Sequence, residues 1–302
     1  MKLPFFKPAV PPHVFCLRAD GVTYASIRLE PPVGIAESRF FAYPAGTVAG
    51  DPPRFTREAV AEAVEAARRL SGGRLSRASA VFPDAWARVL PVEFDTLPSA
   101  PEAVQSMVVW KLKKLRPGEK AEMTVAYRDM PPAGEGRRLL VAAAPAEMLQ
   151  SIERSFEEAG VRLGSLVPES LSLFEGLGPL LTARAAGDWA LVHRTSGSFV
   201  FAISSAGRPL LFRQRPAGEQ DGAQDQELRL SLSYYAEKLK GKGLSAVFLH
   251  DSSGHAAFSE AVFPVAPSRL SSALLGADRS LDERVAARPE LMAAFAAVYG
   301  RA

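Results

Sequence analysis

The sequence predicts an α/β protein of two domains, in which helices flank mixed sheets. Short apolar runs of β type alternate with amphipathic helical patterns along the 302 residues, which is typical of layered α/β folds. A chain of this length favours two domains. The Gly/Pro-rich segment at 176–179 marks a border between residues 1–180 and residues 181–302. Both halves open with a strand, a turn and a second strand, which suggests related subdomains.

The first half begins with a hairpin over Val14–Leu29, whose turn is Asp20-Gly21 between two hydrophobic runs. Asp-Gly in that position is a strong hairpin signal. The next expected elements are a strand, a helix and a further strand, at Ser38–Tyr43, Arg57–Leu70 and Ala78–Phe82. Three strands, a helix and another strand form the opening order of a ribonuclease-H-like fold.

A strand–helix–strand subdomain is predicted as an insertion at about 88–165. Its first strand, Arg88–Phe94, contains Pro91, which favours the edge of a sheet. The helix Pro101–Arg116 has several lysines in its last turn, where cations complement the carbonyl end of a helix. Strands and helices are then expected in the order strand, strand, helix, strand, helix, at 121–129, 138–143, 145–159, 161–167 and 169–177.

The second half opens with three short strands, at Ala190–Val192, Ser198–Ser204 and Pro209–Arg213. Small and polar residues between the second and third strands supply the chemistry of a hairpin turn. A helix, a strand, a short strand and an Ala-rich helix follow, at Gln224–Lys240, Leu244–Leu249, within 259–265 and at Pro289–Tyr299. The last helix is a candidate to pack back on the first domain.

Composition excludes several classes of protein. Hydrophobic residues make up 47% of the chain and charged residues 23%, as in an ordinary globular protein. The net charge of +3 argues against nucleic-acid binding. The single cysteine, Cys16, excludes internal disulfides. No apolar run reaches the roughly 18 residues that a membrane span needs, and four early prolines interrupt any signal peptide, so we expect a cytoplasmic protein.

Motifs of independent catalysis are missing. The sequence contains neither a Walker-type GxxxxGK[ST] nor a GxSxG nucleophile elbow. The four histidines, His13, His193, His250 and His255, show no metal-ligand spacing with one another or with Cys16. His250 and His255 flank a predicted loop, where histidines are usually solvated. We therefore assign no catalytic residue and no metal ligand from the sequence.

Four segments occur in an informative order. They run from FPDAWARVLPVEF to AYRDM (82–130), from RRLLVAAAPAEML to FEGL (137–177), from ALVHRTSGSFVFAI to LLFRQ (190–214), and from QELRL to HDSSG (226–254). Together they resemble the type IV pilus assembly protein PilM family, to which the cytoplasmic part of the type II secretion protein GspL is related. The resemblance implies an actin-like (ribonuclease-H-like) two-domain fold with an inserted subdomain.

The resemblance also implies a function. The chain would be a cytoplasmic scaffold, peripheral to the inner membrane, in the assembly platform of a type IV pilus or a type II secretion-like system. Its implied partners are the cytoplasmic tail of a PilN-like membrane protein and the pilus motor ATPases. An extended tail could pair with the edge strand of the insertion. The residues expected to bind it are Arg88, Val89, Leu90 and Val92 on the strand, and Val108 and Lys111 on the helix.

The nucleotide loops of the family are altered in this sequence. Family members hold phosphate in Gly- and Ser-rich loops and carry an acid for magnesium, since backbone amides and a carboxylate are what nucleotide binding requires. Here the second loop reads His-Arg-Thr-Ser-Gly (193–197) and contains no acid. The positions that would touch a nucleotide are Asp20, Gly21, Arg194, Ser196, Gly197, Ser253 and Gly254.

These departures favour a scaffold with a degenerate cleft, no bound cofactor and no enzymatic activity. The alternative is an active actin-like ATPase that binds ATP with magnesium through unusual loops. In that case Arg194 would clamp phosphate directly, with Ser196 and Gly197 donating hydrogen bonds. Otherwise Arg194 is a solvated loop residue.

Overall fold

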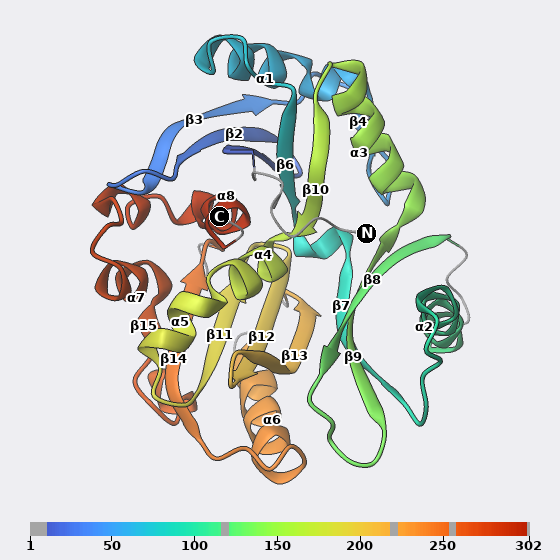
Figure 1. The fold of residues 1–302 in the computed structure, drawn as a ribbon, viewed down its shortest axis with the longest axis vertical. Helices are drawn as coiled ribbons and strands as arrows, with labels where there is room; N and C mark the ends of the chain where they lie inside the picture. The colour runs from blue at the N-terminus through green and yellow to red at the C-terminus, as the bar shows by residue number, and fades with distance from the viewer. Residues whose placement is uncertain (1–10, 116–120, 218–222, 254–257, 301–302) are drawn as a thin grey trace.

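Two five-stranded sheets of matching topology form the body of the molecule (Figure 1). The computed structural model describes residues 11–115, 121–217, 223–253 and 258–300. The first sheet has the order β10-β6-β1-β2-β3. Its strands are β1 (His13–Leu17), β2 (Gly21–Arg28), β3 (Gly34–Ala42), β6 (Arg77–Phe82) and β10 (Arg162–Pro168). The first three are antiparallel, whereas β6 and β10 continue the sheet in parallel with β1.

The second sheet repeats this plan with the order β13-β12-β11-β14-β15. Its strands are β11 (Asp188–Arg194), β12 (Ser198–Ser205), β13 (Arg208–Pro216), β14 (Leu244–Asp251) and β15 (Ser268–Arg269). Again three antiparallel strands come first, and two parallel strands follow. The doubled ribonuclease-H-like arrangement that the sequence predicts is therefore confirmed.

Alternating residues of β1 send their side chains to opposite faces of the first sheet. Phe15 and Leu17 share a core with α1 (Arg57–Leu70) and α3 (Ala146–Glu158). Val14 and Cys16 belong to a second core on the other face. That core contains α4 (Glu169–Gly176), α5 (Gly178–Arg184), α7 (Leu270–Ala277) and α8 (Met292–Tyr299), together with one face of the second sheet.

The last helix, α8, packs against β1, β6 and α4 in the middle of the molecule (Figure 1). Every residue of α8 except Tyr299 is buried. The crossing with α4 is so close that a Cβ on Gly176 would collide with the carbonyl oxygen of Ala296. Because the end of α4 lies this close to α8, there is no room for a side chain at position 176, and glycine is required there.

A third sheet with the order β7-β9-β8 is inserted between β6 and α3. It consists of β7 (Arg88–Phe94), β8 (Met123–Met130) and β9 (Arg137–Pro145), with α2 (Pro101–Leu115) packed on one face. As Pro91 predicts, β7 is an edge strand. The insertion was expected to extend to about residue 165. The inserted sheet instead ends at Pro145, because α3 and β10 pack into the first sheet and its core.

Other differences from the prediction fall on short elements. The strand expected within 259–265 is wrong, since that segment contains the 3-10 turn η2 (Glu260–Val262) and the strand comes later, as β15. The helices α5 and α7 were not predicted, because seven or eight mostly apolar residues leave no polar face to mark the helical period.

The remaining elements are β4 (Val48–Ala49), β5 (Arg54–Phe55), η1 (Asp84–Trp86), α6 (Ala223–Glu237), η3 (Glu283–Val285) and η4 (Pro289–Leu291). None of the described helices is both long and apolar enough to cross a membrane.

Candidate functional site

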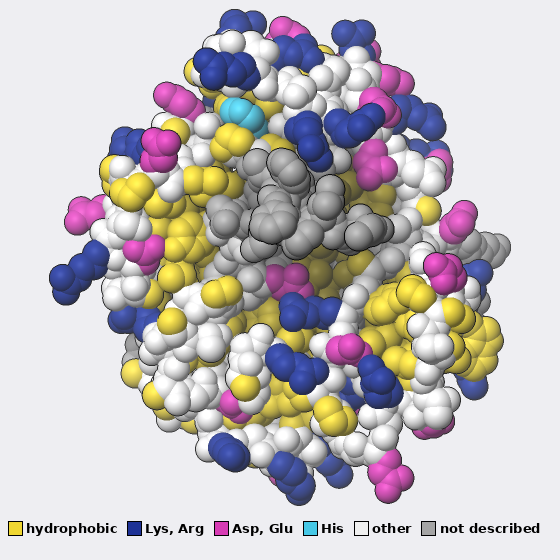
Figure 2. All heavy atoms as spheres, in the orientation of Figure 1, with side chains coloured by type: hydrophobic (Ala, Val, Ile, Leu, Met, Phe, Trp, Pro, Cys, Tyr) yellow, Lys and Arg dark blue, Asp and Glu magenta, His cyan; other side chains and the backbone are white. Residues whose placement is uncertain are grey.

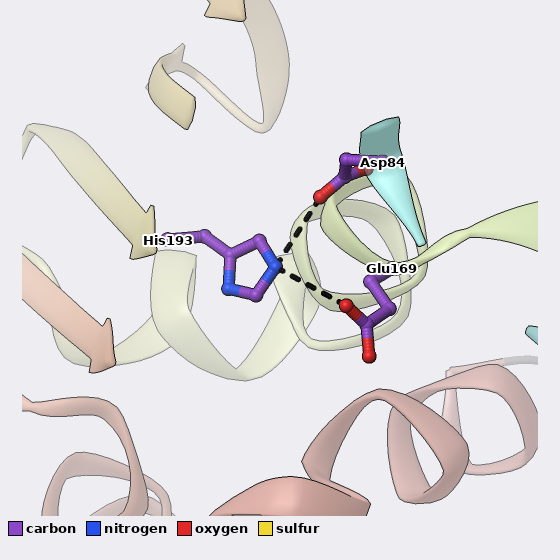
Figure 3. A group of neighbouring side chains, drawn as sticks. All are labelled: Asp84, Glu169 and His193. Atoms are coloured by element: carbon purple, nitrogen blue, oxygen red, sulfur yellow. Dashed lines mark ion pairs between the residues drawn. The ribbon is translucent and has the colours of Figure 1, made fainter. Parts of the chain in front are cut away.

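Three side chains from distant parts of the sequence meet between the two large sheets (Figure 3). Asp84 lies in η1, just after β6, Glu169 is the first residue of α4, and His193 is near the end of β11. His193 Nε2 lies 3.2 Å from Asp84 Oδ2 and 3.8 Å from Glu169 Oε2. Asp84 and His193 are completely buried, whereas Glu169 is partly exposed.

The two acids reach this place by the same local route. Each follows a proline at the end of a strand, Pro83 after β6 and Pro168 at the end of β10. Because β6 and β10 are parallel neighbours, their carboxyl ends meet at one edge of the sheet. The repeated pattern of strand, proline and acid marks both residues in the sequence, but it places them together only once β6 and β10 are known to be neighbours.

Asp84 is held by the beginning of α4. Its Oδ1 accepts hydrogen bonds from the hydroxyl of Ser170 at 2.6 Å and from the backbone N–H of Ser170 at 3.1 Å. A carboxylate at the N-terminus of a helix is stabilised by the free amides there. Asp84 therefore has a fixed orientation that leaves Oδ2 directed at His193.

A chain of hydrogen bonds continues on the other side of His193. Its Nδ1 lies 2.8 Å from Nδ1 of His250, and Nε2 of His250 lies 2.9 Å from the carbonyl oxygen of Pro289. Burial by itself lowers the pKa of His193, but Asp84 and Glu169 outweigh it and raise the pKa to about 9. Burial, and then the charge of His193, lower the pKa of His250 well below its ordinary value.

The expectation of a solvated His250 is wrong. This residue belongs to β14 and is buried, because β14 continues past the predicted end of the strand and pairs His250 with His193 of β11. His255 lies outside the described residues. The loop 193–197 contains no acid of its own, as the sequence shows, but the fold supplies Asp84 and Glu169 from the first half of the chain.

Arg194 is not a solvated loop residue either. Its side chain is buried, and its Nε and Nη2 donate to Oδ2 of Asp251 while Nη1 donates to Gln224 at 3.2 Å. Its guanidinium carbon also lies 4.1 Å from the centre of the Phe258 ring. These contacts direct the charge of Arg194 into the protein.

The other residues expected near a nucleotide are either exposed to solvent or bonded to other groups of the protein. Asp20 is exposed at the β1–β2 turn, and a Cβ on Gly21 would collide with Phe41, so the chain is closely packed there. Ser196 and Gly197 are exposed at the β11–β12 turn. The hydroxyl of Ser253 donates to Oδ1 of Asp251 at 2.6 Å, and Gly254 lies outside the described residues.

A groove of about 520 Å³ separates the inserted sheet from the second large sheet. Three consecutive residues of β7, Arg88, Val89 and Leu90, line it, and all three are among the candidate partner-binding residues. The other walls come from α2, β8 and the β12–β13 pair, including Val109, Leu112, Lys113, Met123, Ser198, Gln214 and Arg215. Figure 2 shows hydrophobic side chains gathered over the part of the molecule that α2 occupies in Figure 1.

The remaining predicted partner-binding residues do not line the groove. Val92 and Val108 are buried in the core between α2 and the inserted sheet. The ammonium of Lys111 lies 5.5 Å from the centre of the Phe94 ring. Helical periodicity identified the apolar face of α2, but that face covers its own sheet, and the groove is lined by neighbouring positions.

Gln214 connects the two sides of the groove. Its Nε2 donates to the carbonyl oxygens of Asp84 at 2.6 Å and Ala87 at 2.9 Å, and its Oε1 accepts from the backbone N–H of Val89 at 2.7 Å. One side chain of β13 thus holds both the segment that carries Asp84 and the edge strand of the insertion. No sequence motif marks Gln214 for this role.

Comparisons with known proteins support the fold. No protein-family model matches the sequence, and no curated protein matches it either. Among solved structures, a PilM–PilN type IV pilus biogenesis complex matches with a TM-score of 0.73 and 15% identity, covering 98% of this chain and 100% of the other. The cytoplasmic domain of Epsl, an inner-membrane component of the type II secretion system of Vibrio cholerae, matches with a TM-score of 0.49 and 12% identity, covering 87% and 92%. The chain therefore has the actin-like fold of the PilM protein, and the predicted resemblance to that family is confirmed in the fold.

Proposed function

We propose that this chain is a scaffold of a type IV pilus or type II secretion-like assembly platform that binds the extended cytoplasmic tail of a PilN-like protein. One observation carries the proposal: a groove lies beside an edge strand in a fold shared with a protein solved as a PilM–PilN complex. In this proposal the chain is cytoplasmic, reaches the inner membrane through that partner, and links it to the motor ATPases.

The chemistry of the groove suits an extended peptide. Three consecutive residues of β7, an edge strand, border it. Val89 already donates its backbone N–H to Gln214 and Pro91 has none, so a bound tail would depend chiefly on pockets for its side chains, which give specificity. Leu90, Leu112 and Met123 supply apolar contact area, and Lys113 places a cation at the rim, where Arg215 is already paired with Glu227. A tail with apolar residues beside an acidic one would match these walls.

The direct test is binding of a synthetic PilN-like tail peptide, measured by fluorescence anisotropy. Leu112→Glu puts a charge on the apolar wall and should weaken the peptide affinity at least about tenfold, a loss of about 1.4 kcal/mol. Leu230→Glu is the matched control, because Leu230 is exposed on α6, which does not line the groove. Circular dichroism verifies that both variants are folded. Absence of binding at high micromolar peptide, or equal affinities for all three proteins, would contradict the proposal.

We further propose that the loops expected to hold a nucleotide do not bind Mg-ATP in the manner of actin-like ATPases. Three placements support this. The charge of Arg194 is directed at Asp251, the hydroxyl of Ser253 is bonded to the same carboxylate, and Arg18 in the first turn donates to the carbonyl oxygen of Glu290. A phosphate would have to displace these contacts.

Thermal unfolding with and without Mg-ATP tests this second proposal. A ligand present at about 100 times its dissociation constant should stabilise the protein by roughly 2.7 kcal/mol. We expect no shift of the unfolding temperature with millimolar Mg-ATP. A saturable shift would establish nucleotide binding and support the ATPase alternative.

A further inference from the structure

The cluster of Asp84, Glu169 and His193 contains the donor set of a metal site. Their ligand atoms lie within 4.8 Å of one another, and two of the three side chains are fully buried. We propose that these three residues bind a divalent transition-metal ion, which joins the first half of the chain to the second. None of the three side chains lines the peptide groove, although Gln214 contacts the backbone of both places.

The distances agree with ligands around one ion. Zinc-type ions lie about 2.1 Å from nitrogen and oxygen ligands, so two ligands of one ion at angles of about 90–110° are roughly 3.0–3.4 Å apart. The separation of His193 Nε2 and Asp84 Oδ2 is 3.2 Å. Glu169 Oε2 is farther from the imidazole, at 3.8 Å. The Glu169 side chain is partly exposed, so a small rotation of it would bring Oε2 as close to the imidazole as Asp84 Oδ2.

The hydrogen-bond chain through His250 sets the state of the imidazole. The carbonyl oxygen of Pro289 only accepts, so Nε2 of His250 carries a proton, and Nδ1 of a neutral His250 must accept from His193. Nδ1 of His193 therefore carries a proton, which leaves Nε2 as the ring atom that faces the two carboxylates. That arrangement is repulsive unless a cation lies between them.

The cation can be a proton on Nε2 or a metal ion. Nε2 is buried and lies 3.2 Å from Asp84 Oδ2, a separation that suits a protonated imidazole as well as two ligands of one ion. A proton and a metal ion both lie along the Nε2 lone pair in the ring plane, but a metal ion also takes oxygen ligands from beside that direction. Figure 3 shows Asp84 and Glu169 on the Nε2 side of the ring, and their ligand atoms lie within 4.8 Å of one another.

Outer contacts fix each buried ligand, as in known metal sites. Ligating histidines usually donate their other N–H to a neighbouring acceptor, and ligating carboxylates are hydrogen-bonded in turn. His193 meets this condition through Nδ1 and His250, and Asp84 meets it through Ser170. Such contacts hold the donor atoms in place before an ion arrives.

The donor set indicates the class of metal. Imidazole suits zinc, cobalt, nickel and iron, whereas magnesium and calcium prefer sites made of oxygen alone. One nitrogen and two carboxylate oxygens therefore favour a first-row transition ion, with at least one coordination position left for water. Because Asp84 and Glu169 follow strands of the first sheet while His193 belongs to the second, the ion would hold the two sheets together.

The test uses the full chain without a histidine tag, stripped with EDTA and desalted at neutral pH. Isothermal titration with ZnCl₂ and the visible absorption of Co²⁺ measure affinity and stoichiometry, with MgCl₂ as the metal control. We expect one ion per chain, and a higher unfolding temperature with zinc but not with magnesium. Zinc binding must compete with the proton on His193, so affinity should rise with pH.

Glu169→Gln removes one ligand charge and keeps the shape of the side chain. It should weaken zinc affinity about tenfold or more, a loss that even an outer partner of a metal ligand can cause. Glu175→Gln is the matched control, because Glu175 is an exposed glutamate of the same helix paired with Arg128. Its affinity should equal that of the unaltered protein.

Two results would overturn the proposal. One is the absence of zinc and cobalt binding to the unaltered chain at high micromolar metal, which would leave a proton as the cation between the carboxylates. The other is binding of equal strength in the Glu169→Gln and Glu175→Gln proteins, which would place the metal elsewhere. Neither result bears on binding of the PilN-like peptide.

Discussion

The two large sheets begin with equivalent hairpins, β1–β2 and β11–β12, whose polar residues differ in burial. In the first hairpin Ala19 and Asp20 are exposed at the turn, and half-buried Arg18 makes one hydrogen bond to the carbonyl oxygen of Glu290. In the second hairpin His193 and Arg194, just before the turn, are buried and bonded on several sides. One backbone plan thus supports a solvent-facing turn and a buried polar network.

The neighbouring parallel strand explains the difference. Near the carboxyl end of β1, Cys16 pairs with Val81 of β6, so this end of the first sheet is apolar. At the corresponding end of β11, His193 pairs with His250 and Arg194 with Asp251 of β14. Charged residues are buried where a partner of opposite charge or a hydrogen-bonding group occupies the adjacent strand. Substitutions in the two hairpins test this interpretation.

The largest effect is expected for Arg194→Ala in the second hairpin. This change leaves Asp251 without its main cation, and breaking a buried ion pair costs about 3 kcal/mol at the lower end of the usual range. The lower end applies because the Asp251 side chain is 31% exposed. Urea unfolding measures the loss. Ser196→Ala, at the exposed turn of the same hairpin, is the control and should stay within about 0.5 kcal/mol.

The fall of the unfolding free energy at acid pH gives a second test of the Arg194–Asp251 pair. Burial raises the pKa of Asp251, but hydrogen bonds from Arg194 and Ser253 outweigh it and hold the pKa below its ordinary value of 3.8. The stabilisation from this pair is therefore present above that pH and is lost as the pH falls further. The Arg194→Ala protein should lose less stability on acidification than the unaltered protein. An unchanged fall at acid pH would mean that the pair contributes nothing.

An intermediate effect is expected for Gln214→Ala, on the third strand of the second hairpin unit. The change removes three hydrogen bonds and leaves buried backbone groups unpaired, which should cost about 2 kcal/mol. It should also weaken binding of the PilN-like peptide, because Gln214 holds β7 beside the groove. Gln226→Ala on exposed helix surface is the control. Equal stability of the two variants in urea would contradict the role assigned to Gln214.

The smallest effect is expected for Arg18→Ala in the first hairpin. This arginine is half-buried and makes one hydrogen bond to a backbone carbonyl, so its loss should cost about 1 kcal/mol. The measurement is again urea unfolding. A loss as large as that of Arg194→Ala would show that the two hairpins carry equal polar networks.

Much of the fold follows from local patterns in the sequence. The helix Arg57–Leu70 and the strand Arg88–Phe94 have the predicted bounds, because a proline or glycine break and a regular apolar period mark them. The short apolar helix α7 has no polar face and escaped prediction. Val92 and Val108 illustrate a second limit, since periodicity predicts that an apolar residue is buried but not which surface buries it.

The candidate site was less accessible to sequence reasoning. In the sequence His193 is part of an unusual loop and one of four histidines without metal-ligand spacing, and the proline–acid pattern at Asp84 and Glu169 is informative only once β6 and β10 are known to be neighbours. The expectation of a solvated His250 failed because the length of β14, which depends on pairing with β11, decides its burial.

Local patterns predict most strands and helices in their order, apart from α5, α7 and β15, and the resemblance of four ordered segments to a known family predicts the actin-like fold with an inserted subdomain. Which polar groups meet depends on how the sheets pack: Asp84 and Glu169 with His193, Arg194 with Asp251, and Gln214 with β7. The physical reason is the distance along the chain over which each interaction acts. Helical and strand periods are set by neighbours along the chain, whereas these contacts depend on the order of strands in a sheet and on how two sheets face each other.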